Sequence, residues 1–236
     1  MTSQGVPEID QTTMRVKPNL GLLSSVLLLA TAWAMAAPGL DVHEIAKKVD
    51  NRYNRLHTLQ ADFVEIYRGA GIDRTETGDL WLKKPGKMRW EYRSPREKLF
   101  LSDGKDAWFY VPGDRQVRRT PVKKLDDLRS PLGFLLGKTQ LEKELQGLSL
   151  APDVPPLAAG NLVLRGVPKS MADRVSQVLL EVDAEGQLAR IEIEEVDGAI
   201  TEYRFSSQKE NVDVGEQRFR FDPPAGVEVI DGEFGQ

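Results

Sequence analysis

Hydrophobic and polar residues alternate with a period of two along most of the chain after about residue 58. In the run from Met88 to Arg93, for example, apolar side chains fall on one side and charged side chains on the other. Half-buried antiparallel strands produce this pattern. Turn signals separate the runs: Gly69-Ala70-Gly71, Pro85-Gly86, Asp103-Gly104, Pro112-Gly113-Asp114, Glu185-Gly186 and Asp197-Gly198. The spacing predicts about ten or eleven strands that form a barrel or a strongly curved sheet.

Two segments depart from this alternation. Residues 41–57 place Ile45, Val49, Tyr53 and Leu56 at helical spacing behind Asp41, which predicts a helix with one apolar face. Leucines recur through residues 121–147, which predicts one or two short helices inserted midway through the sheet. The apolar stripe of the first helix fits simple core packing, and it fits equally a helix that lies across a groove.

The first 36 residues have the parts of an export signal. Arg15 and Lys17 precede an apolar run of about 15 residues, which is short for a membrane span, and small residues follow it. We expect cleavage after Ala36, with Ala34 as the near alternative. The competing interpretation is an uncleaved N-terminal anchor, and Met14 is a second candidate start. The chain then divides into a signal peptide, 1–36, and a single domain, 37–236.

Composition narrows the class of protein. The chain has 236 residues, is 40% hydrophobic and contains no cysteine, which suits one domain with a sizeable core and excludes disulfides and thiolate chemistry. The net charge of −4 gives no reason to expect a nucleic-acid partner. The charge is uneven, with a net of +8 over residues 83–124 and −10 over 181–236. Solvated strand faces and a two-ended steering surface both explain this asymmetry.

The sequence contains no recognisable catalytic constellation. The two histidines, His43 and His57, stand at the ends of the predicted helix, and no nucleophile elbow, phosphate loop or dinucleotide fingerprint occurs. We therefore expect no enzyme activity, no catalytic residue, no metal and no cofactor. A curved sheet with helices over one face can instead hold an apolar ligand. The same side chains could also close into a dry core.

One stretch has the character of a family signature. From Gly78 to Tyr92 the chain reads GDLWLKKPGKMRWEY, and related features follow in order: Pro95, Leu99 to Lys105, Ala107 to Tyr110, Pro112, Ser130-Pro131-Leu132 and Phe219 to Val227. In these features the chain resembles the LolA family of periplasmic outer-membrane lipoprotein carriers. The resemblance runs over most of residues 41–230. It is densest between Gly78 and Pro112.

The resemblance implies a mainly β fold, an incomplete antiparallel β-barrel covered by the N-terminal helix and a short helical lid. It implies a periplasmic carrier, a chaperone for lipoprotein transport and outer-membrane biogenesis. Its expected partners are acylated lipoproteins as cargo, an inner-membrane ATP-driven release complex and, where one exists, an outer-membrane receptor. We expect a monomer. The alternatives are a half-barrel sensor or receptor of lipoproteins or envelope stress, and a periplasmic lipid or glycolipid carrier.

The resemblance also suggests site residues. Lys84 stands where the family usually has an arginine that latches the lid, and Met88 stands at a cavity position often held by phenylalanine. Strand parity places five residues near the acyl-chain groove: Met88, Trp90, Phe100, Trp108 and Tyr110. The predicted underside of the lid consists of Leu132, Phe134 and Leu135.

Overall fold

A computed structural model describes residues 41–124 and 140–232 of the chain. Its longest helix, α1 (Val42–Arg55), begins behind Asp41, whose side chain accepts a hydrogen bond from the His43 backbone N–H at 2.9 Å. This cap satisfies one of the free N–H groups at the helix start. The predicted apolar stripe is buried on α1 and at Leu56, so the prediction of this helix is confirmed.

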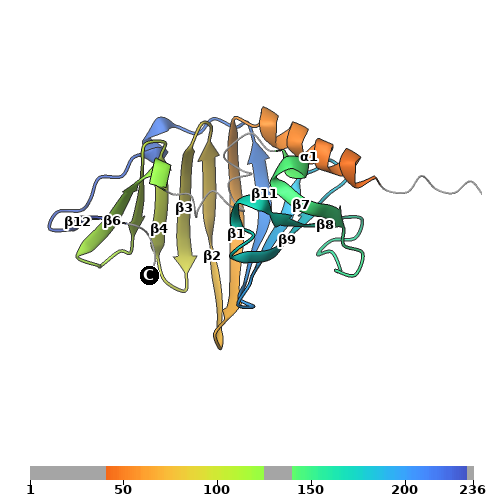
Figure 1. Cartoon of the computed structure of the whole chain (residues 1–236). Helices are drawn as coiled ribbons and strands as arrows, with labels where there is room; N and C mark the ends of the chain where they lie inside the picture. Colours follow the sequence, from red (N-terminus) through yellow and green to blue (C-terminus); the bar gives the residue numbers. More distant parts are fainter. Residues whose placement is uncertain (1–40, 125–139, 233–236) are drawn as a thin grey trace, which may run out of the picture. The chain divides into compact units, whose positions relative to one another are not determined.

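The strands form one open sheet (Figure 1). Their order is β12-β6-β5-β4-β3-β2-β1-β11-β10-β9-β8-β7, and the described residues contain 12 strands, slightly more than predicted. All neighbouring strands are antiparallel except β12 and β6. The bounds are β1 (Thr58–Gly69), β2 (Ile72–Lys83), β3 (Lys87–Ser94), β4 (Lys98–Asp103), β5 (Asp106–Tyr110), β6 (Gln116–Pro121), β7 (Leu145–Leu150), β8 (Leu162–Pro168), β9 (Val175–Val182), β10 (Leu188–Glu195), β11 (Ile200–Glu210) and β12 (Glu228–Asp231). The predicted incomplete antiparallel barrel is therefore confirmed.

The central hairpin joins β1 to β2 through a tight turn. Ala70 and Gly71 both have positive φ, 49° and 77°, which gives a two-residue connection the twist that antiparallel strands require. The pairing then runs without interruption from Gly69–Ile72 to Thr58–Lys83. This hairpin fixes which residues of β1 and β2 share a face.

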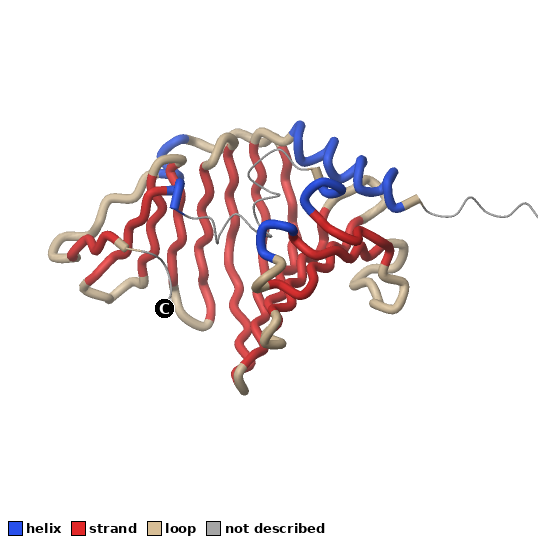
Figure 2. The backbone as a smooth tube through the Cα atoms, viewed as in Figure 1, coloured by secondary structure: helices blue, strands red, loops and turns tan. Residues whose placement is uncertain are grey.

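The two faces of the sheet have different coverings. We call the face that carries Leu80 and packs against α1 the inner face, and the opposite one the outer face. One buried cluster joins α1 to inner-face residues of β2 and β3 and to those of β8, β9 and β10. Because strands so far apart in the sheet order share one cluster, the sheet must curve around α1, as the tube in Figure 2 shows.

The inserted segment is only partly helical. The 3-10 helix η1 (Val122–Lys124) and the short α3 (Leu141–Glu144) lie within the predicted helical range 121–147, but residues 145–147 belong to β7, so the prediction is wrong there. Residues 125–139, with Leu132, Phe134 and Leu135, lie outside the described residues, as does the predicted signal peptide, 1–36. Within the described ranges, the structure contains no helix with the length and apolar character of a membrane span.

Candidate functional site on the inner face of the sheet

Strand register brings three of the five predicted groove residues together. Met88 pairs with Leu82, and Trp90 pairs with Leu80 on one side and with Phe100 on the other. Because directly opposed residues project to the same face, all of these side chains lie on the inner face. Met88 and Trp90 are only 3% and 2% exposed, whereas Phe100 is partly buried at the edge of the cluster.

Trp108 and Tyr110 lie on the outer face, so the prediction that they join the groove is wrong. They pair with Leu101 and Leu99, which alternate with Phe100 along β4. Both rings instead pack against Phe221 of the C-terminal segment, at centroid distances of 5.6 Å. The cause is the connection from β4 to β5. Four residues separate the last opposed pair, Ser102 and Ala107. The inward-facing residues are therefore even-numbered in β4 and odd-numbered in β5.

Three aromatic rings contact Trp90 on the inner face. Phe63 of β1 contacts Trp90 edge-on at a centroid distance of 4.7 Å, and Tyr203 and Phe205 of β11 lie 5.6 and 6.3 Å from it. Tyr92 adds a further edge-on contact to Phe63 at 5.0 Å. Aromatic pairs in this geometry stabilise a core beyond their burial alone. The indole nitrogen of Trp90 has no hydrogen-bond partner, although it is buried among residues that the structure describes.

Beyond the aromatic rings the inner face becomes charged. Glu65 and Glu76 face each other directly across β1 and β2, and both are buried. Lys98 donates to Glu76 at 2.6 Å, and Arg74 lies 3.1 Å from Glu76 and 3.8 Å from Glu65. The hydroxyl of Tyr92 donates to Glu65 at 2.7 Å. Burial raises the pKa of Glu65, against the effect of the Tyr92 hydrogen bond. We call Glu65, Glu76, Arg74 and Lys98 the charged cluster.

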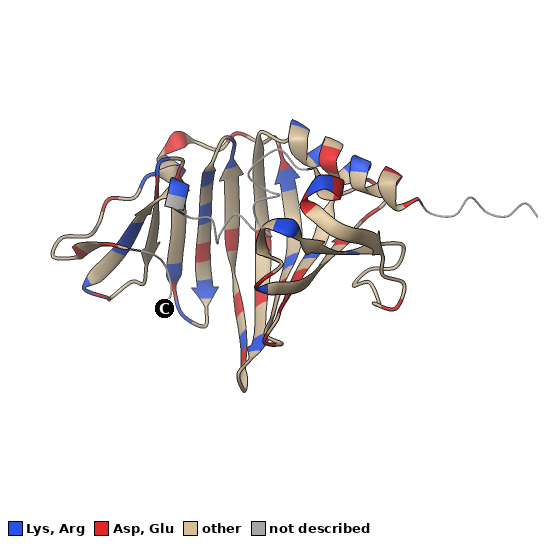
Figure 3. Ribbon diagram, viewed as in Figure 1, with Lys and Arg blue, Asp and Glu red and all other residues tan. Residues whose placement is uncertain are grey.

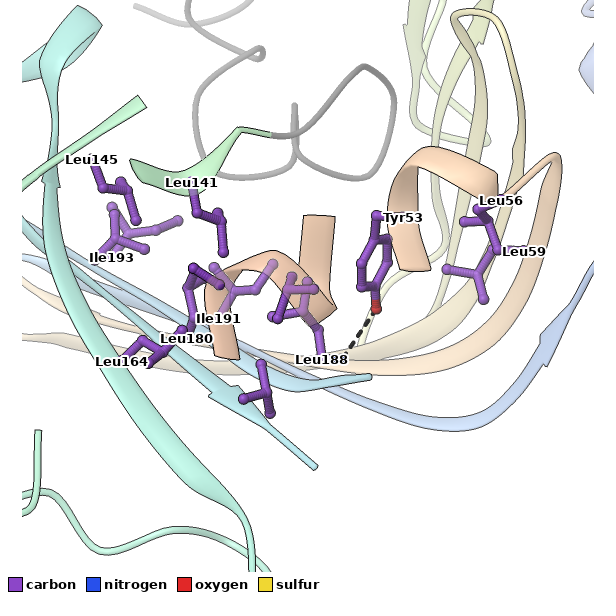
Figure 4. Close-up of a cluster of buried hydrophobic side chains, with 14 of the residues drawn as sticks. Tyr53, Leu56, Leu59, Leu141, Leu145, Leu164, Leu180, Leu188, Ile191 and Ile193 are labelled. Atoms are coloured by element: carbon purple, nitrogen blue, oxygen red, sulfur yellow. Dashed lines mark hydrogen bonds between the residues drawn. The ribbon is translucent and has the colours of Figure 1, made fainter. Parts of the chain in front are cut away.

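Helix α1 covers the inner face over the other half of the sheet. Figure 4 shows Tyr53 of α1 beside Leu188 of β10, and Leu56 beside Leu59 of β1. The hydroxyl of Tyr53 accepts the backbone N–H of Leu188 at 3.1 Å, which fixes the helix to β10. The carboxylate of Asp50 accepts the N–H of Leu141, so α1 also holds the start of α3.

Lys84 contacts α1 from the turn between β2 and β3. Its ammonium group donates to the backbone carbonyl of Tyr53, in the last turn of the helix. Burial lowers the pKa of Lys84. A cation at this position interacts favourably with the negative end of the helix dipole.

The outer face is occupied by the chain itself. Lys83 and Lys87 pair with Glu216, and Arg119 pairs with Asp231 at 2.7 Å. The basic stretch 83–124 and the acidic stretch 181–236 thus neutralise one another at these positions rather than forming opposite ends of a steering surface. Figure 3 shows the resulting mixture of both signs along the strands.

The outer face also holds a cavity of about 450 Å³ beside this segment. Its lining includes three arginines, Arg89, Arg218 and Arg220. Guanidinium groups prefer water or anions to hydrocarbon. This cavity therefore does not suit acyl chains, and the inner face remains the apolar candidate site.

The family model for outer membrane lipoprotein carrier protein LolA matches residues 54–222, more than half of the chain. The chain belongs to the LolA family. Proteins named outer-membrane lipoprotein carrier protein are similar to it. The one from Nitrosospira multiformis is 33% identical over 178 residues, 73% of this chain and 82% of the relative. The one from Salmonella typhimurium is 30% identical over 212 residues, 89% and 94% of the two chains.

Among solved structures, the Mycobacterium tuberculosis lipoprotein LppX is similar to this chain. It is 15% identical, with a TM-score of 0.48 over 74% of this chain and 98% of LppX.

Several inner-face residues of this LolA-family protein were missed in the sequence. Phe63, Tyr203 and Phe205 carry the same alternating signal as Trp90, but only the pairing of β1 with β11 places them beside it. The charged cluster gave no signal at all, because Glu65 and Glu76 are 11 positions apart and meet only through the hairpin register.

Proposed function

We propose that this protein carries acylated lipoproteins through the periplasm, shielding their acyl chains on the inner face of its sheet. The observation that carries the proposal is the single apolar cluster that joins α1 with both halves of the sheet, in a chain of the LolA family. Each CH₂ group removed from water is worth about 0.8 kcal/mol, so three exposed acyl chains would cost on the order of 30 kcal/mol. A soluble carrier offsets that cost during transit.

The contact surface consists of Met88, Trp90 and Phe100, which share the inner face. Trp108 and Tyr110 have no part in it. The segment with Leu132, Phe134 and Leu135 acts as a lid over this surface. Lys84 holds α1 over the sheet through its hydrogen bond to the backbone carbonyl of Tyr53, and in this way it acts as the latch of the lid. A lid that opens and closes lets the carrier release its cargo instead of binding it permanently.

Export and handover complete the proposed cycle. Residues 1–36 direct export and are removed, which leaves residues 37–236 as the carrier domain. An ATP-driven complex of the inner membrane loads the protein, and an outer-membrane receptor or the membrane itself accepts the cargo. The proposal requires no catalytic group and no cofactor. Sequencing of the N-terminus of the periplasmic protein tests the export step, because a chain that retains residues 1–36 would contradict it.

Site-specific photo-crosslinking in the periplasm tests the cargo. A benzophenone side chain replaces Met88 on the inner face, and the matched control replaces Trp108 on the outer face of the same half of the sheet. Lipoproteins attached through their acylated ends at position 88, and absent at position 108, are the expected result.

Other adducts would contradict the proposal in identifiable ways. Free lipid alone at position 88 would identify a lipid or glycolipid carrier. One non-acylated protein would identify a sensor or receptor. No adduct at either position would identify a closed core.

A further inference from the structure

The inner face changes character in three steps along β1, β2 and β3. Near the turn that carries Lys84 it is aliphatic, with Leu59, Leu82 and Met88. The next rows are aromatic and centre on Trp90 and its neighbouring rings. The rows nearest the β1–β2 hairpin carry the charged cluster. The order from aliphatic through aromatic to charged is that of a membrane interface, where tryptophan and tyrosine occupy the boundary.

Trp90 supplies an unused hydrogen-bond donor at that boundary. Its indole N–H is buried, with the residue 2% exposed, and it has no partner in the part of the chain that the structure describes. The rings of Phe63, Tyr203 and Phe205 surround the indole, and the Tyr203 hydroxyl forms no hydrogen bond with its N–H. Folded proteins pair nearly all buried donors, so an unpaired one at a binding surface indicates an acceptor that arrives with a ligand.

The charged cluster gives the ligand a direction. Two carboxylates and two cations balance there, and Arg74 remains 46% exposed while Glu76 is 4% exposed. Hydrocarbon cannot lie beside these ions without removing their solvation, whereas a polar group can. An amphiphile on the inner face therefore lies with its chains toward Met88 and its polar part toward the cluster.

From these observations we infer that the Trp90 indole N–H donates to an ester carbonyl of the acylated cargo, whose polar end points toward the charged cluster. The inference rests on the proposed carrier function. Ester carbonyls are the acceptors closest to the chains of a diacylglyceryl group, and the hydrocarbon beyond them offers none. Trp90 is thus a specificity-determining residue that distinguishes an ester-linked chain from plain hydrocarbon.

Two synthetic lipopeptides test the hydrogen bond. They share one peptide and a cysteine with two C16 chains on its glyceryl group, and the chains are joined by ester bonds in one probe and by ether bonds in the other. We expect the wild-type protein to bind the ester probe about fivefold more tightly, the value of one ordinary hydrogen bond. The preference should fall to about one in Trp90→Phe, which keeps an aromatic ring and loses the N–H. It should persist in Trp81→Phe, an outer-face control.

The outcomes separate this inference from the function on which it rests. Equal binding of both probes by the wild-type protein, or an unchanged preference in Trp90→Phe, would overturn the role of Trp90 and leave the carrier function standing. Failure of the wild-type protein to bind either probe would overturn the carrier function. The wild-type comparison needs no variant, so it holds even if Trp90→Phe folds poorly.

Crosslinking from the two ends of β4 tests the direction. Glu97 precedes this strand next to Lys98 of the charged cluster, and Lys105 follows it at the opposite end, and both residues are exposed. A benzophenone at position 97 should label the peptide part of the bound ester probe several times more than one at position 105. Equal labelling, or stronger labelling at position 105, would overturn the assigned orientation.

Discussion

Replacement of Lys84 by leucine should loosen α1 without unfolding the sheet. The ammonium group of Lys84 donates to the Tyr53 carbonyl, and a hydrogen bond that involves a charged group contributes about 1.5–3 kcal/mol. Two features place the effect at the lower end of this range. The Tyr53 carbonyl also accepts the Leu56 N–H, so it keeps a partner in the variant. Burial lowers the pKa of Lys84, because desolvation of the ammonium group offsets part of the free energy of this hydrogen bond.

A loss of about 1.5 kcal/mol corresponds to roughly a tenfold increase in the open population of the helix. Native-state hydrogen exchange of a peptide that spans Val42–Arg55 measures this population directly. The matched control is Lys83→Leu, because the adjacent Lys83 contacts Val214 and Glu216 on the outer face and not α1. Lys84→Arg should keep exchange close to wild type, because a guanidinium can reach the same carbonyl.

The same three variants connect the helix to function. In a transfer assay Lys84→Leu should retain lipoproteins poorly, and Lys83→Leu should retain them as well as the wild type does. Exchange of α1 in Lys84→Leu within twofold of the wild type would refute the role of this contact. Faster exchange with unchanged cargo retention would refute the latch and leave only the structural contact.

Three further predictions concern other parts of the fold. Glu181→Ala should destabilise the protein by about 3–5 kcal/mol in chemical denaturation. The variant leaves the buried guanidinium of Arg190 and the N–H groups of Leu157 and Ala158 without their carboxylate. A change below about 1 kcal/mol would count against this role of Glu181. The pKa of His43 is raised by its hydrogen bond to Glu142. This contact between α1 and α3 is therefore fully present below about pH 6.5 and is lost as the pH rises through the higher folded-state value. The protection factors of the α3 amides, which correct for base-catalysed exchange, should fall toward alkaline pH in the wild type but not in His43→Gln. Gly78→Ala should lower the free energy of unfolding by about 3 kcal/mol, because the new Cβ would stand 2.0 Å from the backbone oxygen of Glu91 in β3. The control Gly215→Ala, whose Cβ would have no atom within 4 Å, should leave thermal denaturation unchanged.

Local patterns predicted the elements of this fold well. The helix at Val42–Arg55 follows from a 3.6-residue stripe and a cap, both of which lie within the segment itself. Alternation likewise identified the inward-facing Met88 and Trp90 within β3. These features depend on neighbours in sequence, so one segment contains the whole signal.

The arrangement of side chains across strands was much harder to predict. Trp108 and Tyr110 were assigned to the wrong face of the sheet. The face of a residue can be extended from one strand to the next only when the number of residues in the connecting turn is known, because one residue more or less moves every side chain to the other face. The charge asymmetry of the sequence had the same limitation. Glu216 and Lys87 are far apart in the chain, and only the return of the C-terminal segment across the outer face brings them together.

The two faces of the sheet differ in what covers them. On the outer face, Glu181 accepts hydrogen bonds from the loop before β8 and pairs with Arg190, while the C-terminal segment covers Trp81. On the inner face, the indole of Trp90 remains unpaired between apolar rows and the charged cluster. This arrangement suits a protein that binds its ligand reversibly, because the contacts of the outer face hold the strands in register while the Trp90 N–H is left for the cargo. Removal of this donor by Trp90→Phe should therefore abolish the preference for an ester-linked ligand, while the smaller ring lowers the stability of the empty protein.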